Sequence, residues 1–275
     1  EEEMAAAGAA RERAEGALHK SFAEWERGTL VFDTDLQDAL RETTASLTRN
    51  DQALLRMLAE ARREPSLVAH AFATYTLVTA LLKQAGVAEA AIADLGLAAI
   101  LHDFGWLKLP RNLLLKATPF TDKEKTLAAL HTELMEPLLA AAGEVPERVR
   151  HWVRQHEKLP LEDNPPGLEN PLDRRLLAAL QVVDKYDELC AGIMGNQGRT
   201  PSAALSFLYK RSLAGVYAAE WVHKLIFTLG VYPLGSAVIL GNREKGIIAE
   251  IHRDRPLQPI VEVRYNRLGQ PLAKV

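Results

Sequence analysis

Hydrophobic positions recur every three or four residues over most of this chain, which is the spacing of amphipathic helices. The first 64 residues are rich in Ala and charged side chains and are interrupted around residues 26–35. This pattern predicts two or more lead-in helices of a bundle or stalk. The next helix is expected to begin at Pro65 and to end at Gly86, because glycine readily adopts the left-handed conformation of a helix C-terminus.

Helical periodicity continues to about residue 229. Thr121 and Glu124 have the spacing of a capping box, and they predict the start of a helix that ends at Gly143. Pro146 is expected in the first turn of the helix that follows it. The Pro-, Asp- and Asn-rich segment 159–171 predicts a loop. The other helices are predicted at residues 88–104, 172–191 and 201–229.

The pattern changes after residue 230, where short β-branched runs alternate with turn-like segments. Such runs predict a small antiparallel sheet. They lie at residues 236–240, 246–251 and 259–265. The sequence therefore predicts a mostly α fold in three parts: a helical lead-in (1–64), a helical domain (65–230) and a small β appendage of that domain (231–275).

Composition narrows the classes of function. The chain is 48% hydrophobic and 25% charged, with a net charge of −3, so we expect a globular protein without the basic stripe of a DNA-binding protein. Cys190 is the one cysteine, which excludes an intramolecular disulfide and favours a reducing cytoplasm. No apolar run approaches the roughly 20 residues of a membrane helix, so no membrane partner is expected. Because the chain begins at Glu1 rather than Met, we also expect an upstream part.

Histidines and aspartates lie at or near the predicted inner faces of five helices. A single histidine on an apolar helix is more typical of a hydrogen-bonded core residue than of a ligand, and an isolated buried carboxylate needs a partner. Taken as a group, however, these residues offer mixed nitrogen and oxygen ligands, which suit Fe, Mn, Zn, Co or Ni. The candidate metal ligands are His70, His102, Asp103, His131, His156 and Asp184.

The order of these residues, together with the motifs around them, resembles the HD superfamily of metal-dependent phosphohydrolases, in its HD-GYP branch. The resemblance covers about residues 20–270 and includes the motifs "VAHAFATYT", "LHDFGWLKLP", "HTELMEPLL", "RQHEK", "VVDKYDEL" and "LGVYPLGSAVIL". It implies an HD-type helical bundle that hydrolyses cyclic di-GMP at a centre of two or three divalent metals.

The resemblance also implies roles for the individual ligands. His70, His102, Asp103 and Asp184 match the four positions that define the HD metal site. Asp103 matches the catalytic carboxylate that bridges to a second metal, which His131 and His156 complete. Gln155 stands where the family has another histidine and is a possible weak ligand. Ser66 stands where some members have a glutamate ligand, so a third metal is not expected.

The positions that hold substrate in the family are degenerate here. Trp106 replaces a lysine that contacts phosphate, and Asp163 and Asn164 replace the Gly-Tyr of the signature loop. After the last Asp of its pattern the family has an Arg, a Tyr and a further cation that bind substrate. This chain has Ile193, Gly195 and Asn196 at those positions. Lys108 and Arg199 are the cations expected to contact a substrate in their place.

Three hypotheses therefore stay open. One is a metal-dependent phosphodiesterase with one or two ions and weak or lost turnover of cyclic di-GMP, or activity on another phosphoester. Another is an inactive metal-binding HD-GYP module that signals through a protein partner. In the third, the six polar residues only bond one another in a helical core. A homodimer packed through residues 1–27 is a further alternative.

Overall fold

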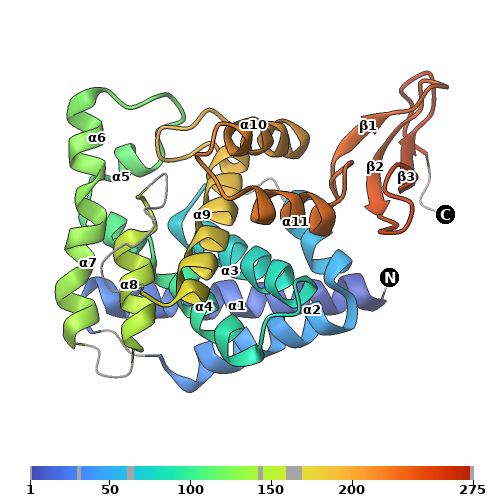
Figure 1. Cartoon of the computed structure of the whole chain (residues 1–275). Helices are drawn as coiled ribbons and strands as arrows, with labels where there is room; N and C mark the ends of the chain where they lie inside the picture. Colours follow the sequence, from blue (N-terminus) through green and yellow to red (C-terminus); the bar gives the residue numbers. More distant parts are fainter. Residues whose placement is uncertain (1, 30–31, 61–64, 142–144, 159–168, 273–275) are drawn as a thin grey trace.

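Helix α9 (Pro171–Ala191) lies near the middle of the molecule in the view of Figure 1. Every residue from Leu176 to Asp184 is buried, which is typical of a helix enclosed on all sides. This computed structural model describes residues 2–29, 32–60, 65–141, 145–158 and 169–272. Helices α3, α4, α8, α10 and α11 all pack against α9.

The bounds of the other elements follow the chain. Before α9 lie α1 (Glu2–Glu26), α2 (Thr34–Glu60), α3 (Leu67–Gln84), α4 (Glu89–Leu101), the 3₁₀ helix η1 (Phe104–Lys108), α5 (Arg111–Leu114), α6 (Asp122–Ala128), α7 (Leu130–Ala141) and α8 (Glu147–Gln155). After it lie α10 (Pro201–Leu213), α11 (Ala219–Leu229), β1 (Ala237–Ile239), β2 (Lys245–Glu250) and β3 (Ile260–Tyr265).

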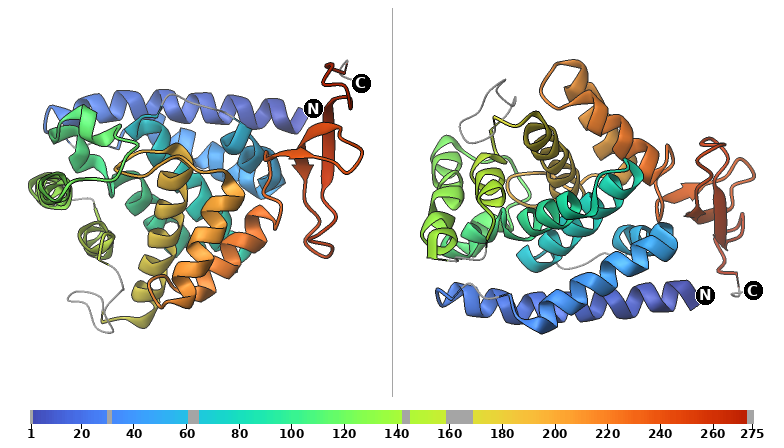
Figure 2. Two further views of the ribbon diagram at one scale, coloured as in Figure 1. Left: turned by 90° about the horizontal axis from the view of Figure 1, so that it is seen from above. Right: turned by 60° about the horizontal axis from the view of Figure 1, so that its bottom comes forward.

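The lead-in helices α1 and α2 lie side by side along one face of the bundle, and α1 spans most of its length (Figure 2). Trp25 near the end of α1 is fully buried. Its ring contacts those of Phe22, Phe32 and Phe104, with centroids 5.1–5.2 Å apart. Because Phe104 begins η1 directly after Asp103, these rings fasten the lead-in to the segment that holds a candidate ligand.

The three strands form an antiparallel sheet in the order β1-β2-β3 at one end of the molecule (Figure 1). The sheet is bound to α2, since Gln52 exchanges hydrogen bonds with the backbone of Ile251. Gly235 approaches the same helix so closely that a Cβ atom there would lie 2.7 Å from the Cβ of Ala59. The predicted sheet is confirmed.

Two predicted helices are wrong in their extent. The helix expected over 201–229 is interrupted after Leu213, because the chain turns through Gly215 at a positive φ of 75°. The capping box of Thr121 and Glu124 is confirmed, but its helix ends at Ala128 and a new one begins at Leu130. The predicted end of that helix, Gly143, lies outside the described residues.

Smaller differences concern the ends of α3 and one apolar segment. The helix expected from Pro65 begins at Leu67, with Ser66 as its N-cap, while Gly86 has the expected positive φ of 68°. The segment Glu89–Lys108 is, contrary to expectation, long and apolar enough to span a membrane by composition alone. In the structure 72% of its most apolar window is buried, and α4 packs against α3, α8 and α9.

Replacing Trp25 by alanine removes one of the two rings of α1, with Phe22, that contact Phe104 in η1. We expect Trp25→Ala to lower the free energy of unfolding by about 3–5 kcal/mol, the usual cost of truncating a fully buried aromatic side chain. Phe227 is half exposed, so Phe227→Ala serves as the matched control and is expected to cost less than about 1 kcal/mol. Urea unfolding of both variants tests this; a cost for Trp25→Ala no larger than the control's would contradict the packing described.

Candidate metal centre

The six predicted ligands lie on or beside five helices, α3, α4, α7, α8 and α9, and their side chains converge. Helices α5 and α6 lie between α4 and α7 in the chain and carry none of the six. His70 lies in the first turn of α3 and Asp184 in the middle of α9. The remaining four lie where helices begin or end. His102 is the C-cap of α4, Asp103 precedes η1, His131 is the second residue of α7 and His156 is the C-cap of α8.

A first group joins His70, His102, Asp103 and Asp184, whose candidate ligand atoms all lie within 4.8 Å of one another. The Nε2 atom of His70 lies 3.2 Å from Oδ2 of Asp103 and 3.2 Å from Oδ1 of Asp184. The Nε2 atom of His102 lies 3.4 and 3.2 Å from the same two oxygens. Two nitrogens and two carboxylates therefore enclose one small space.

A second group uses the other oxygen of the same aspartate. Oδ1 of Asp103 lies 3.2 Å from Nε2 of His131 and 3.4 Å from Nε2 of His156. These two nitrogens are 3.2 Å apart. Asp103 thus lies between both groups, with one oxygen turned toward each.

Helix ends set the orientation of three imidazoles. The Nδ1 atoms of His102, His131 and His156 each lie 2.7–2.9 Å from the carbonyl oxygen three residues earlier, in the last turn of the preceding or same helix. Carbonyls there lack an intrahelical donor. Because a carbonyl only accepts, Nδ1 holds the hydrogen of the neutral imidazole, and each Nε2 in that form presents a lone pair to the centre.

Asp187 orients the fourth imidazole, a role that the sequence analysis missed. Its Oδ2 lies 2.7 Å from Nδ1 of His70, so that the Nε2 of His70 faces the first group. A carboxylate behind a histidine is a common outer partner of metal ligands. The signal was present in the sequence, since Asp187 follows Asp184 by three residues and lies on the same side of α9.

The centre is buried and rich in acceptors. Asp103 is 3% exposed, and in the described part of the chain neither of its oxygens accepts a hydrogen bond. Burial alone raises the pKa of Asp103, but the charge of His102 and the contacts with three further imidazoles hold it well below its usual value. Burial lowers the pKa of His70, yet Asp103, Asp184 and Asp187 outweigh this effect and raise it.

The imidazole nitrogens and carboxylate oxygens are stabilised by a positive charge between them, since a buried unpaired carboxylate costs several kcal/mol. Imidazole nitrogens with carboxylate oxygens suit borderline divalent cations. The residues present therefore fit one divalent metal in each group, with Asp103 shared.

Gly105 and Trp106 hold the second group in place. A Cβ atom on Gly105 would lie 1.9 Å from the carbonyl oxygen of His131, so only glycine permits η1 and α7 to approach this closely. Trp106 is 3% exposed and stacks on the His131 ring, with centroids 5.3 Å apart and planes at 21°. The residue expected to mark a lost phosphate contact therefore packs against a candidate ligand.

The other degenerate positions have structural roles of their own. Ser66 accepts a hydrogen bond from the amide of Ala69 as the cap of α3. Ile193 is buried, and Gly195 has a φ of 78° at a place where an added Cβ would lie 3.0 Å from the Phe120 ring. Asp163 and Asn164 lie outside the described residues.

Gln155 and the two expected substrate cations lie at different distances from the centre. Gln155 is buried beside His156, and its Oε1 accepts no hydrogen bond within the described ranges, so a role as weak ligand stays a prediction. The ammonium of Lys108 donates to the carbonyl oxygen of Glu26 at the end of α1. The guanidinium of Arg199 lies 4.9 Å from the centroid of the Phe207 ring.

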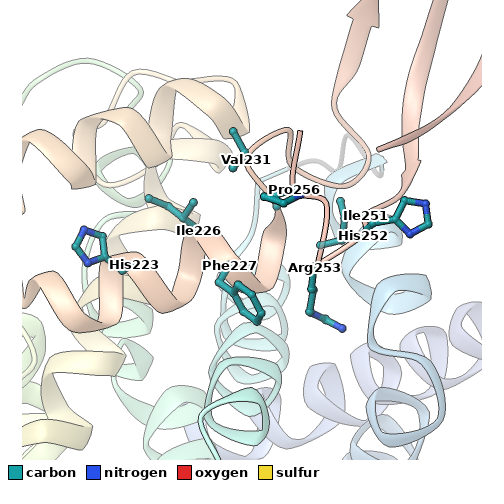
Figure 3. A pocket seen from close by; sticks show the side chains of 9 residues that line it. His223, Ile226, Phe227, Val231, Ile251, His252, Arg253 and Pro256 are labelled. Atoms are coloured by element: carbon teal, nitrogen blue, oxygen red, sulfur yellow. The ribbon is translucent and has the colours of Figure 1, made fainter. Parts of the chain in front are cut away.

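A cleft of about 830 Å³ reaches the outer side of the centre. His70, Asp187 and Arg199 line it together with side chains of α2 and the sheet. A smaller pocket of about 210 Å³ lies between α11 and the segment after β2 (Figure 3). Its two histidines, His223 and His252, lie far apart in that view, and none of the candidate ligands lines it.

Comparison with known proteins identifies relatives of the chain. It is 25% identical over 267 residues to a cyclic di-GMP phosphodiesterase of Pseudomonas aeruginosa, covering 97% of this chain and 64% of that protein. It is 30% identical over 132 residues to the cyclic di-GMP phosphodiesterase response regulator RpfG of Xanthomonas campestris, covering 46% of this chain and 34% of that protein. The chain thus spans less than two thirds of either curated relative.

A solved structure shares the fold. A protein of Bdellovibrio bacteriovorus, described as an HDG"Y"P protein, superposes with a TM-score of 0.62 and 19% identity, over 77% of this chain and 67% of that one. The family model of the HD domain matches residues 47–218, which is more than half of the chain. The chain therefore belongs to the HD domain family.

Proposed function

We propose that the chain is a cyclic di-GMP signalling domain whose centre hydrolyses a phosphodiester with the help of two divalent metals. The observation that supports this most is the position of Asp103, whose two oxygens face two separate groups of imidazoles. A single structural ion would need only one of these groups. The curated relatives are named cyclic di-GMP phosphodiesterases, which favours that substrate over other phosphoesters.

Each group of residues has a distinct part in the proposed reaction. Divalent metals supply a water of lowered pKa and neutralise charge on the phosphoryl oxygens. Asp103 and Asp184 hold positive charge at a fixed place, while the helix-end carbonyls and Asp187 fix the directions of the four Nε2 atoms. We propose iron or manganese as the metal, with zinc, cobalt or nickel as alternatives.

The surroundings favour slow turnover. Phosphoryl transfer depends mainly on positioning and electrostatic stabilisation, so each missing cation lowers the rate. Trp106 offers a ring where a cation would bind phosphate, and Lys108 is held at the end of α1. Arg199 lines the cleft that also reaches His70, which supports its proposed role as a substrate contact.

The alternative is an inactive HD-GYP module that binds metal and signals through a protein partner. The burial of Ile193 and the tight turn at Gly195 favour it, because the segment that would bind substrate instead packs against the protein. Both functions retain the metal centre, and they differ in turnover.

Hydrolysis separates the two functions. We expect manganese-loaded protein to open cyclic di-GMP slowly, and Asp103→Asn to lower the rate at least about a hundredfold, or about 2.7 kcal/mol in the barrier. Asp254→Asn, which changes an exposed aspartate far along the chain, is the matched control and should retain the rate. Chromatography of the products measures this; bound metal without any turnover in the unaltered protein would favour the inactive module.

Gly105 provides a test of the number of ions. An added Cβ pushes η1 from α7 and separates His131 from Asp103, so we expect Gly105→Ala to lower bound manganese from two equivalents to about one. Gly16→Ala is the matched control, since a Cβ there meets nothing within 4 Å. Elemental analysis of dialysed protein gives the ratio; two equivalents in Gly105→Ala would argue against a second site at His131.

The pH dependence of stability gives a further test. In metal-free protein burial lowers the pKa of His70, but its carboxylate neighbours raise it overall, and the pKa of His102, His131 and His156 is raised as well. Protonation of these imidazoles therefore stabilises the fold fully below pH 6.5, and that stability is lost as the pH rises through the raised pKa values.

A metal replaces those protons, so its effect on the melting temperature should be larger at pH 8 than at pH 5.5. With manganese at about a hundredfold its dissociation constant we expect a rise of about 5–10 °C at pH 8. Calorimetry with and without manganese measures it. An equal or larger rise at pH 5.5 would show that metal and protons do not compete.

A further inference from the structure

A further carboxylate lies beside the second group of candidate ligands. Oε1 of Glu157 is 4.0 Å from Nε2 of His131, the nitrogen that faces Oδ1 of Asp103. Glu157 directly follows His156, in the turn that ends α8. Its side chain is 52% exposed, and no other histidine, lysine or arginine of the described residues forms an ion pair with it. Glu157 is part of the motif "RQHEK", but the sequence did not single it out as a ligand.

Gln181 of α9 holds the turn that carries Glu157. Its Nε2 donates at 2.8 Å to the carbonyl oxygen of Lys158 and at 3.4 Å to that of Gln155. The backbone amide of Lys158 donates at 3.0 Å to the same Gln155 oxygen. Gln181 is 3% exposed, so the backbone on both sides of Glu157 is fixed against a buried part of α9. The distance between the carboxylate and His131 is therefore set by rotations of the Glu157 side chain alone.

The second group has one ligand fewer than the first. Its donors are Asp103, His131 and His156, whereas four residues form the first group. Gln155 stands where the family has a further histidine, and its amide oxygen is a weaker ligand than imidazole. Manganese accepts six ligands in octahedral geometry, so a fourth protein ligand still leaves a position for water. A carboxylate beside this group therefore has a position to fill.

The distance between Glu157 and His131 fits within one coordination sphere. Two donors that each lie about 2.1 Å from a divalent metal are at most about 4.2 Å apart. Oε1 of Glu157 and Nε2 of His131, at 4.0 Å, are inside that limit. The group of close donors does not yet include Glu157, so a rotation of its half-exposed side chain completes the approach.

The charge of the centre also favours a further carboxylate. Among the candidate ligands, Asp103 and Asp184 are the carboxylates, and two divalent cations carry twice their charge. A third carboxylate lowers this excess in a buried place, where uncompensated charge is costly. A carboxylate oxygen in place of an imidazole nitrogen also makes the second group harder, which suits manganese better than zinc.

We propose that Glu157 is a ligand of the second metal and takes the place that the family gives to a histidine at the position of Gln155. This rests on the two-metal centre of the proposed function for the presence of the ion. It requires neither cyclic di-GMP as the substrate nor any turnover.

Manganese binding to the full chain tests the proposal without an activity measurement. Metal-free protein is titrated while electron paramagnetic resonance measures free manganese, which gives a dissociation constant for each equivalent. Glu157→Gln keeps the shape of the side chain and removes its charge. We expect this variant to weaken the second equivalent about ten- to a hundredfold and to leave the first within about threefold. Glu147→Gln, at an exposed glutamate in the first turn of the same helix, is the matched control and should bind both equivalents normally.

Cobalt adds a spectroscopic signature that a merely structural role of Glu157 would not change. Visible absorption of cobalt depends on the number and type of its ligands. We expect the absorption added by the second cobalt equivalent to differ between Glu157→Gln and the unaltered protein, and that of the first equivalent to be the same in both.

Each other outcome decides the proposal. A second manganese equivalent that binds Glu157→Gln within about threefold of the unaltered protein overturns it. Loss of both equivalents also overturns it, because Glu157 would then support the fold rather than one ion. A single equivalent in the unaltered protein contradicts this proposal and the two-metal centre together. A weakened second equivalent in a chain that does not hydrolyse cyclic di-GMP supports Glu157 as a ligand and contradicts the phosphodiesterase function alone.

Discussion

The buried carboxylate of Asp103 is the constraint on which the structure depends. It is 3% exposed and lies between four imidazole nitrogens, and in the described part of the chain no donor other than these imidazoles reaches its oxygens. Such a charge is costly unless positive charge lies beside it. Protons on the histidines meet this need in part, and the residues present also fit divalent metals, which would meet it at neutral and alkaline pH.

Helix ends orient the imidazoles that surround Asp103. Two of the histidines are helix C-caps and a third, His131, begins α7 just after α6 ends, and carbonyls at these helix ends hold each Nδ1 so that each Nε2 turns inward. The close approach at Gly105 and the stacked ring of Trp106 fix the second group. The aromatic contacts of Trp25 extend this support to the lead-in helices, which also bind the sheet through α2. The contacts that pack the bundle therefore also position the candidate metal ligands.

Local patterns in the sequence were sufficient for much of the fold. The capping box at Thr121, the C-terminal glycine at Gly86 and the alternating strands were predictable, because each depends on a few neighbouring residues. The break at Gly215 was missed, because a glycine within a helical pattern does not reveal where tertiary packing turns the chain. The six candidate ligands were found by their order along the chain. The division into a lead-in, a helical domain and a β appendage stays a prediction.

The parts of the site that depend on contacts between distant elements were not predictable. Trp106 could be identified as a departure from a phosphate-binding pattern, but its stacking on His131 depends on how η1 meets α7. The hydrogen bonds that join Asn196 to Lys185 and Glu188 depend on the turn after α9, so they were not foreseen.

Anomalous diffraction from crystals grown with manganese tests the central claim most directly. The account predicts two peaks on either side of Asp103, one within coordination distance of His70, His102 and Asp184, the other within coordination distance of His131 and His156. A map without a peak at either place, with the imidazoles turned away from the carboxylates, would contradict it.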